Sequence, residues 1–175
     1  MRIVTPSVVG LSLTFTALHG QGPTAAPADV ATPEAIVLAA YASIQRAPGA
    51  PYQWDRFRSL FLPNAHLVPN TEQTDGTFTP LTVQGFIDWV DRVAPAGAEG
   101  DQGFAEVEVK HHVERYGDIA HVFSTYQKHY WDQDQILGRG INSFQLVRHR
   151  GRWWITGIVW DEETGAGPIP SRYLP

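Results

Sequence analysis

Carboxylate, imidazole and phenol side chains are concentrated in one segment of the chain, "FAEVEVKHHVERYGDIAHVFSTYQKHY" (104–130). A carboxylate or imidazole next to a phenol can remove a proton from carbon and stabilise the enolate that forms. Glu108, His112 and Tyr126 have the residue types for this chemistry. They are therefore the candidates in this segment for a general acid and base.

The register of the segment decides which of these side chains meet. Polar and apolar residues alternate, which predicts two paired strands. A three-residue turn at 116–118 would place Glu108 across from Tyr126 and His112 near Ser124. A two-residue turn would change which residues of the second strand share each face. The alternative interpretation is a hydrogen-bonded polar layer, or a solvated sheet face, without catalytic function.

Four histidines of the same segment, His111, His112, His121 and His129, are poor candidates for a metal site. Adjacent residues of a strand point to opposite faces, and no carboxylate–histidine spacing accompanies them. The chain also has no nucleotide or flavin motif and no cysteine. We therefore predict no metal and no cofactor.

A ligand pocket is expected where the sheet meets the helices. Asp161 follows the apolar run "RWWITGIVW", so it is the best single candidate for an acid that faces a ligand. The alternatives are a strand-terminal acid in water for Asp161 and ordinary core packing for Tyr41 and Trp54. The residues expected to line the pocket are Tyr41, Trp54, His66, Tyr126, Asn142, Phe144 and Asp161.

Three helices are predicted in the first half of the chain. Thr32-Pro33-Glu34 has the pattern of an N-cap, a first-turn proline and a first-turn acid, and apolar residues follow at helical spacing. "WDRFRSLFLP" predicts a second helix that Pro63 ends, and Thr82 is expected to cap a third. Between the last two lie a short strand, "AHLVP", and a turn at Asp75-Gly76.

The second half predicts strands, because the period changes from helical to alternating. The expected strands are 104–115, 119–131, 140–149 and 152–161. Their separators have the length of hairpin loops or slightly more, so the sheet should be antiparallel. Helices followed by a meander of strands indicate an α+β fold.

The last predicted strand carries Trp153, Trp154 and Trp160. A two-residue turn at Arg150-Gly151 would pair His149 with Arg152 and sort the side chains into two faces. The core face would hold Trp153, and the other face would expose a large uncharged patch, which predicts a homodimer. The alternative is that the C-terminal tail covers this patch. The interface residues would be Ile141, Ser143, Gln145, Trp154, Thr156, Ile158 and Trp160.

Composition and the N-terminus set further limits. The 175 residues carry a net charge of -5 with no basic stripe, which argues against nucleic-acid binding. Arg2 and the uncharged run to Leu18 predict a signal peptide over 1–20, followed by a flexible tether over 21–31 and one domain over 32–175. The mature protein would then be secreted or periplasmic and outside the membrane. The alternative is a cytoplasmic protein with an irregular N-terminus.

Five segments resemble the nuclear-transport-factor-2-like superfamily, and within it the SnoaL-like or uncharacterised bacterial members. They are "RFRSLFLPNAHL", "YGDIAHVFSTY", "RGINSFQLV", "GRWWITGIVWDEE" and "PIPSRYLP", and the likeness covers roughly 30–175. The resemblance implies a cone in which three N-terminal helices pack in the concave face of a strongly curved antiparallel sheet. It also implies an internal pocket that is open at one end, and often a homodimer.

The resemblance leaves the activity open, because this scaffold hosts both enzymes and noncatalytic domains. The enzymes place an Asp, or an Asp/His pair, inside the cone with the help of tyrosines, and none of these sets matches this chain residue by residue. We therefore expect a small-molecule-binding domain. The alternatives are a cofactor-free isomerase, dehydratase or cyclase that acts by proton transfer, and a structural dimerisation module.

Overall fold

The computed structural model describes residues 24–70 and 79–175. The predicted signal peptide (1–20) and the Asp75-Gly76 turn lie outside these residues. The helical elements are η1 (Pro27–Val30), α1 (Pro33–Ile44), α2 (Trp54–Arg58), α3 (Val83–Val93), α4 (Glu163–Ala166) and η3 (Ser171–Tyr173). The strands are β1 (Phe61–Val68), β2 (Leu81–Thr82), β3 (Ala105–Tyr116), β4 (Ile119–His129), β5 (Ile136–His149) and β6 (Arg152–Glu162). Within the described part of the chain, no helix is long and apolar enough to cross a membrane.

Two of the predicted helices begin where their capping residues indicate. The Thr32 hydroxyl accepts a hydrogen bond from the Ala35 amide at 3.1 Å, and Pro33 is the first residue of α1. The Thr82 hydroxyl accepts from the Gly85 amide at 3.0 Å at the start of α3. Each bond satisfies a first-turn N–H that has no partner inside its helix.

The second helix is shorter than the sequence predicts. α2 ends at Arg58, and β1 begins at Phe61, before Pro63. The reason is tertiary: the Ile155 amide donates to the Leu60 carbonyl at 2.9 Å, and Phe61 pairs with Ile155. Strand pairing with β6 thus replaces the last helical turn that the local pattern favours.

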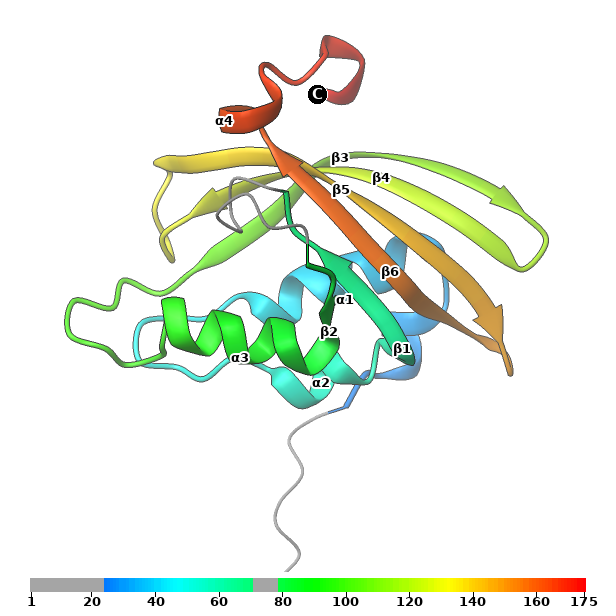
Figure 1. Ribbon diagram of the computed structural model, residues 1–175, viewed down its shortest axis with the longest axis horizontal. Helices are drawn as coiled ribbons and strands as arrows, with labels where there is room; N and C mark the ends of the chain where they lie inside the picture. The colour runs from blue at the N-terminus through cyan, green and yellow to red at the C-terminus, as the bar shows by residue number, and fades with distance from the viewer. Residues whose placement is uncertain (1–23, 71–78) are drawn as a thin grey trace, which may run out of the picture.

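The sheet curves around the helices, and its strand order is β2-β1-β6-β5-β4-β3. Figure 1 shows α1, α2 and α3 on the concave side, with α4 and the C-terminal segment on the other side. This is the predicted α+β cone. The sheet is not wholly antiparallel, however, because β1 runs parallel to β6.

The β5–β6 hairpin has the predicted turn but a different register beyond it. Arg150 and Gly151 have φ values of 51° and 81°, as a tight hairpin turn requires, and His149 pairs with Arg152. The register then shifts between Gln145 and Leu146, so that Gln145 pairs with Gly157. This bulge adds one residue to β6 and reverses the faces that follow.

The bulge corrects three of the sequence-based assignments. Ile158 and Trp160 point into the cone and line its cavity, so neither belongs to the outer surface assigned to a dimer. Asp161 pairs with Ile141 on the outer side, where its Oδ1 accepts from Asn70 Nδ2 at 2.6 Å. The prediction assumed that side chains alternate between the two faces along the whole of β6. Such alternation leaves no place for the extra residue of a bulge.

The β3–β4 hairpin also departs from its predicted register. Its turn has two residues, Gly117 and Asp118, since Tyr116 pairs with Ile119. Glu108 lies opposite Tyr126, as expected, but the register shifts between Glu108 and Lys110.

Beyond this bulge His111, not His112, pairs with Ser124. The His112 side chain is 67% exposed, and its Nε2 lies 3.8 Å from Glu114 Oε1. His112 does not line the cavity, so it does not meet the polar groups as predicted. The cause is again one added residue, which exchanges the two faces of β3.

The C-terminal segment covers part of the outer sheet face. The Thr125 hydroxyl donates to the Tyr173 carbonyl at 2.7 Å, and the Tyr173 ring packs edge-on against Phe123 with 4.9 Å between centroids. Ile169 is also buried. The remaining residues assigned to the interface are Ile141, Ser143, Gln145, Trp154 and Thr156, and the homodimer stays a prediction that sedimentation velocity of the full chain would test.

The predicted tether is shorter than 21–31. Val30 is buried in the core, and Arg56 Nη2 pairs with Asp29 Oδ1 at 2.9 Å. The Ala25 amide donates to the Ser59 hydroxyl at 2.8 Å. Residues from Ala25 onward thus belong to the domain, because they bury apolar surface and an ion pair against α1 and α2.

Candidate functional site

A cavity of about 400 Å³ lies between the concave sheet face and the helices. This volume is within the range of small-molecule sites. Rings form much of its wall: Phe86 stacks on Phe57 with 5.4 Å between centroids and meets Trp160 edge-on at 6.0 Å. The aromatic lining residues are Tyr41, Tyr52, Phe57, Phe86, Trp89, Phe104, Tyr126, Phe144 and Trp160.

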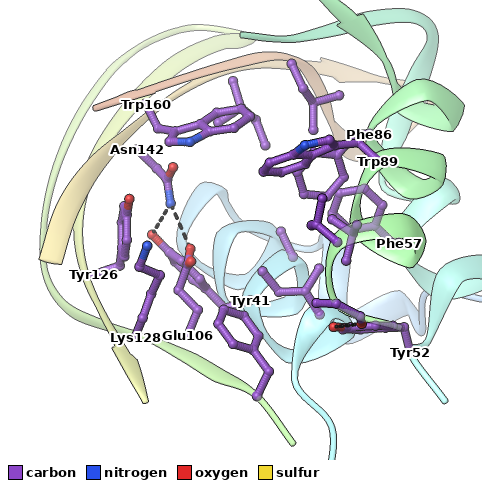
Figure 2. A pocket seen from close by; sticks show the side chains of 18 of the residues that line it. Tyr41, Tyr52, Phe57, Phe86, Trp89, Glu106, Tyr126, Lys128, Asn142 and Trp160 are labelled. Atoms are coloured by element: carbon purple, nitrogen blue, oxygen red, sulfur yellow. Dashed lines mark hydrogen bonds between the residues drawn. The ribbon is translucent and has the colours of Figure 1, made fainter. Parts of the chain in front are cut away.

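The polar groups of the cavity gather at one end, opposite α3 (Figure 2). Lys128 Nζ donates to Glu162 Oε1 at 2.6 Å, and the Tyr126 hydroxyl donates to the same oxygen at 3.3 Å. Neighbouring strands supply all of these side chains, since β3 to β6 lie side by side. The polar lining residues at this end are Glu106, Tyr126, Lys128, Asn142 and Glu162.

Glu106 is one of two acids among the described residues that line the cavity, and the other, Glu162, is paired with Lys128. Asn142 Nδ2 donates to Glu106 Oε1 at 3.3 Å. Burial raises the pKa of Glu106 to about 7, an effect that nearby Lys128 and the Asn142 hydrogen bond oppose and that the charge of Glu162 reinforces. Glu106 is therefore poised to gain or lose a proton near neutral pH.

Asn142 is held by a chain of hydrogen bonds that runs away from the cavity. Its Nδ2 also donates to the Tyr41 hydroxyl at 3.0 Å, which lies 2.7 Å from the Ser124 hydroxyl. Because Ser124 donates to Glu108 Oε2, its oxygen accepts the Tyr41 proton. The phenol of Tyr41 is thus directed away from Glu106.

Burial and the nearby charge of Glu106 raise the pKa of Tyr41 far above its usual value, so the phenol stays neutral. Glu108 completes the chain rather than lining the cavity, and its other oxygen, Oε1, lies 2.6 Å from His111 Nδ1. The candidate acid Glu108 therefore ends the hydrogen-bond chain from Asn142 and does not face the cavity. Glu106, two residues earlier on the same face of β3, does face it.

The remaining sequence-based pocket residues divide into two groups. Tyr41, Tyr126, Asn142 and Phe144 line the cavity, whereas Trp54, His66 and Asp161 do not. Trp54 stacks on Tyr52 with 4.5 Å between centroids and donates to Asp91 Oδ1 at 2.9 Å. His66 is exposed and pairs with Thr82, because β1 turns this side chain away from the core.

One glycine positions Tyr126. A Cβ at Gly140 would lie 2.5 Å from the Tyr126 hydroxyl oxygen, 2.7 Å from its Cζ and in contact with the Asp161 carbonyl. The phenol therefore rests directly on the backbone of β5. Only glycine permits this approach.

Replacing Gly140 by alanine is expected to lower the free energy of unfolding by about 1–3 kcal/mol, because the methyl group must displace the buried Tyr126 ring or the β6 backbone. Gly151→Ala tests a different mechanism: its Cβ would meet nothing within 4 Å, so only the strain of its φ of 81° applies. Urea denaturation measures the loss of stability in both variants. The chemical shifts of Tyr126 should change in Gly140→Ala and stay unchanged in Gly151→Ala. Unaltered Tyr126 signals in Gly140→Ala would refute the close approach.

A buried ion pair fixes the loop beside the cavity. Arg46 Nη1 pairs with Asp101 Oδ2 at 2.6 Å, and Asp101 also accepts from the amides of Gly49, Gly97 and Gly103. These bonds hold the pKa of Asp101 well below its usual value. The pair ties the loop that begins at Ala94 to the end of α1, next to the cavity.

Within residues 24–70 and 79–175, no group of three metal-ligating side chains could hold a metal ion. The polar end of the cavity instead offers a carboxyl group, an amide and a phenol. These groups can transfer a proton or form hydrogen bonds with a bound molecule.

Comparison with known proteins gives the fold its context. No family model and no curated protein matches the chain. A protein of unknown function with a cystatin-like fold from Nostoc punctiforme superposes with a TM-score of 0.55 at 13% identity, over 82% of this chain and 96% of its own. A candidate aromatic ring hydroxylase from Novosphingobium aromaticivorans gives 0.52 at 16% identity, over 74% and 85%.

A third solved structure is an NTF-2-like protein of unknown function from Silicibacter pomeroyi, with 20% identity and a TM-score of 0.48 over 74% of this chain and 91% of its own. The chain has a cystatin-like fold, as the Nostoc punctiforme protein does. This fold agrees with the cone that the sequence resemblance implies. It accounts for the position of the cavity, which lies between the curved sheet and the helices.

Proposed function

We propose that this protein binds a small, mainly apolar molecule in its cone cavity, with the polar group of that molecule directed at Glu106. The observation that carries the proposal is the carboxyl group of Glu106, which accepts a hydrogen bond from the Asn142 amide in the wall of a ring-lined cavity of about 400 Å³. Rings provide contact area, and a few fixed polar groups orient the ligand.

Binding of 2-naphthylmethanol, measured by isothermal titration calorimetry, tests this proposal. The probe is flat and apolar with one hydroxyl group, and we expect a dissociation constant on the order of 100 µM. Trp160→Ala should weaken binding by roughly tenfold, because the lost indole forms part of the wall. Trp154→Ala is the matched control, since it removes an indole from the opposite face of β6. No binding by the wild type, or equal loss in both variants, would overturn the proposal.

Proton transfer is a second candidate function, and the position of Glu106 favours it. A carboxylate that ionises near pH 7 is well matched to abstract a proton from carbon at neutral pH. Burial also keeps the Tyr126 phenol protonated by raising its pKa, and its proton, which is donated to Glu162, would turn to a developing oxyanion. The reaction would need no cofactor.

Deuterium exchange at the α-carbons of 2-tetralone, followed by NMR in D2O, tests the second candidate. The wild type should accelerate exchange on the order of 100-fold over buffer, and Glu106→Gln should return the rate to the buffer value. Glu114→Gln removes a carboxylate that is 72% exposed and should exchange like the wild type. Exchange that is equally fast with Glu106→Gln would exclude Glu106 as the base.

A further inference from the structure

The charges in the cavity wall do not cancel. Among its lining residues, Glu106 and Glu162 are acidic and Lys128 is basic. When all three are ionised, the wall carries one net negative charge. No other lining residue is a lysine, an arginine or a histidine. A bound anion would therefore meet an unfavourable potential at the polar end.

The single cation is already engaged with one of the two acids. Lys128 Nζ lies 2.6 Å from Glu162 Oε1. The carboxyl of Glu106 accepts only a long amide hydrogen bond from Asn142, at 3.3 Å, within the described residues. The Tyr41 hydroxyl cannot add a second one, because its proton is directed at Ser124. Once ionised, Glu106 has no cation in hydrogen-bond contact within the described residues, because Lys128, whose charge still acts on it, is bonded to Glu162.

The aromatic rings around Glu106 also favour a cationic ligand. Figure 2 shows the side chains of Glu106 and Asn142 at the polar end, with Tyr126 beside them and the Trp160 indole above. The electron-rich faces of tyrosine and tryptophan attract cations, most strongly where water is excluded. An ammonium group could therefore pair with Glu106 and lie against these rings, while an apolar body fills the space toward Phe86 and Trp89.

We propose that the natural ligand is a small aromatic or alicyclic amine whose cationic nitrogen pairs with Glu106 at the polar end of the cavity. This inference rests on the proposed function, which requires only that the cavity binds a small molecule. The inference specifies in addition that the ligand carries a positive charge. An alcohol, a ketone or a carboxylate of the same shape would bind less tightly than the amine.

Three probes of one shape test the inference by calorimetry on the full chain: 2-naphthylmethylamine, 2-naphthylmethanol and 2-naphthoate. At pH 8 we expect the amine to bind at least about tenfold tighter than the alcohol, and the carboxylate to bind most weakly. In Glu106→Gln the amine and the alcohol should bind equally. Glu114→Gln should keep the preference for the amine.

The pH dependence provides an independent readout. The titratable groups around Glu106 are Tyr126 and Lys128 of β4, Glu162 of β6 and Tyr41 of α1. Free Glu106 is protonated below about pH 7 and must lose its proton to pair with the amine. Amine affinity should therefore fall by roughly tenfold per pH unit below 7, with a proton released to the buffer, while alcohol affinity stays constant.

The two proposals fail in different ways. Equal affinities of the wild type for amine and alcohol at pH 8 would overturn the amine inference and leave the binding site in place. If none of the three probes binds, the proposed function itself is wrong. Because both comparisons are made on the wild type, they hold even if Glu106→Gln folds poorly.

Discussion

Replacing Trp153 by alanine is expected to lower the free energy of unfolding by about 3–5 kcal/mol, a large fraction of the stability of a domain of this size. The Trp153 side chain is 1% exposed and packs in the central core, with the Arg115 guanidinium 5.0 Å above its ring. The substitution leaves a cavity that strands on both sides cannot close. Urea denaturation followed by circular dichroism measures the loss.

Trp154 provides the matched control, because it is the next residue and faces the other side of β6. Its indole nitrogen donates to the His149 carbonyl at 3.3 Å, and Arg152 stacks on its ring at 3.8 Å. Trp154→Ala removes one cation–π contact on a half-buried surface, so we expect a loss of about 0.5–1.5 kcal/mol. Comparable losses for the two variants would contradict the assignment of faces along β6.

Glu106→Gln is expected to stabilise the protein at alkaline pH. The pKa of Glu106 is about 7 in the folded protein and about 4.5 in the unfolded chain. Between these values the folded state binds more protons than the unfolded state, so the free energy of unfolding falls as pH rises. The ionised carboxylate thus destabilises the fold by roughly 2–3 kcal/mol above pH 7.

The glutamine variant keeps the shape and the hydrogen bond from Asn142 but never ionises. At pH 8 it should exceed the wild type in unfolding free energy by roughly 2–3 kcal/mol, and at pH 4 the two should agree, since both side chains are neutral there. Urea denaturation at both pH values measures this difference. Glu114→Gln should change stability by less than about 0.5 kcal/mol at either pH. A wild type that matches Glu106→Gln at pH 8 would show that Glu106 ionises without penalty.

The parts of the fold that depend on local chemistry could be predicted from the sequence. Thr32 and Thr82 cap their helices through bonds within one turn, and the Arg150-Gly151 turn needs only two residues with positive φ. These features depend only on residues that are close together in the sequence. Sequence reasoning therefore located most helix starts and the ends of the strands within a few residues.

The faces of the strands depend on distant contacts. The bulge in β6 lies where β1 pairs with it and changes register, and a Cβ at Gly157 would approach the His66 carbonyl to 3.2 Å. Gly157 is a local sign of this irregularity, because glycine inside a strand often marks a bulge or a close backbone approach. Alternation alone placed Trp160 outside and Asp161 inside, and the added residue exchanges them.

Glu106 shows why the site was harder to find than the fold. It shares a face with Glu108, but of these two acids only Glu108 was predicted as a candidate from the sequence. The two side chains differ in their depth within the cone. Glu108 is hydrogen-bonded to Ser124 and lies beside His111, whereas Glu106 lines the cavity. Depth depends on the curvature of the sheet and on the position of α1, neither of which the alternation of residues encodes.

The measurement that tests the central claim most directly is a carbon-13 NMR titration of the glutamate side-chain carboxyls, with the Glu106 signal assigned by its absence in Glu106→Gln. If Glu106 faces the ligand cavity, its carboxyl should titrate near pH 7, and saturating 2-naphthylmethanol, which displaces cavity water, should raise this midpoint further. A midpoint near 4.5 that the probe leaves unchanged would contradict the account.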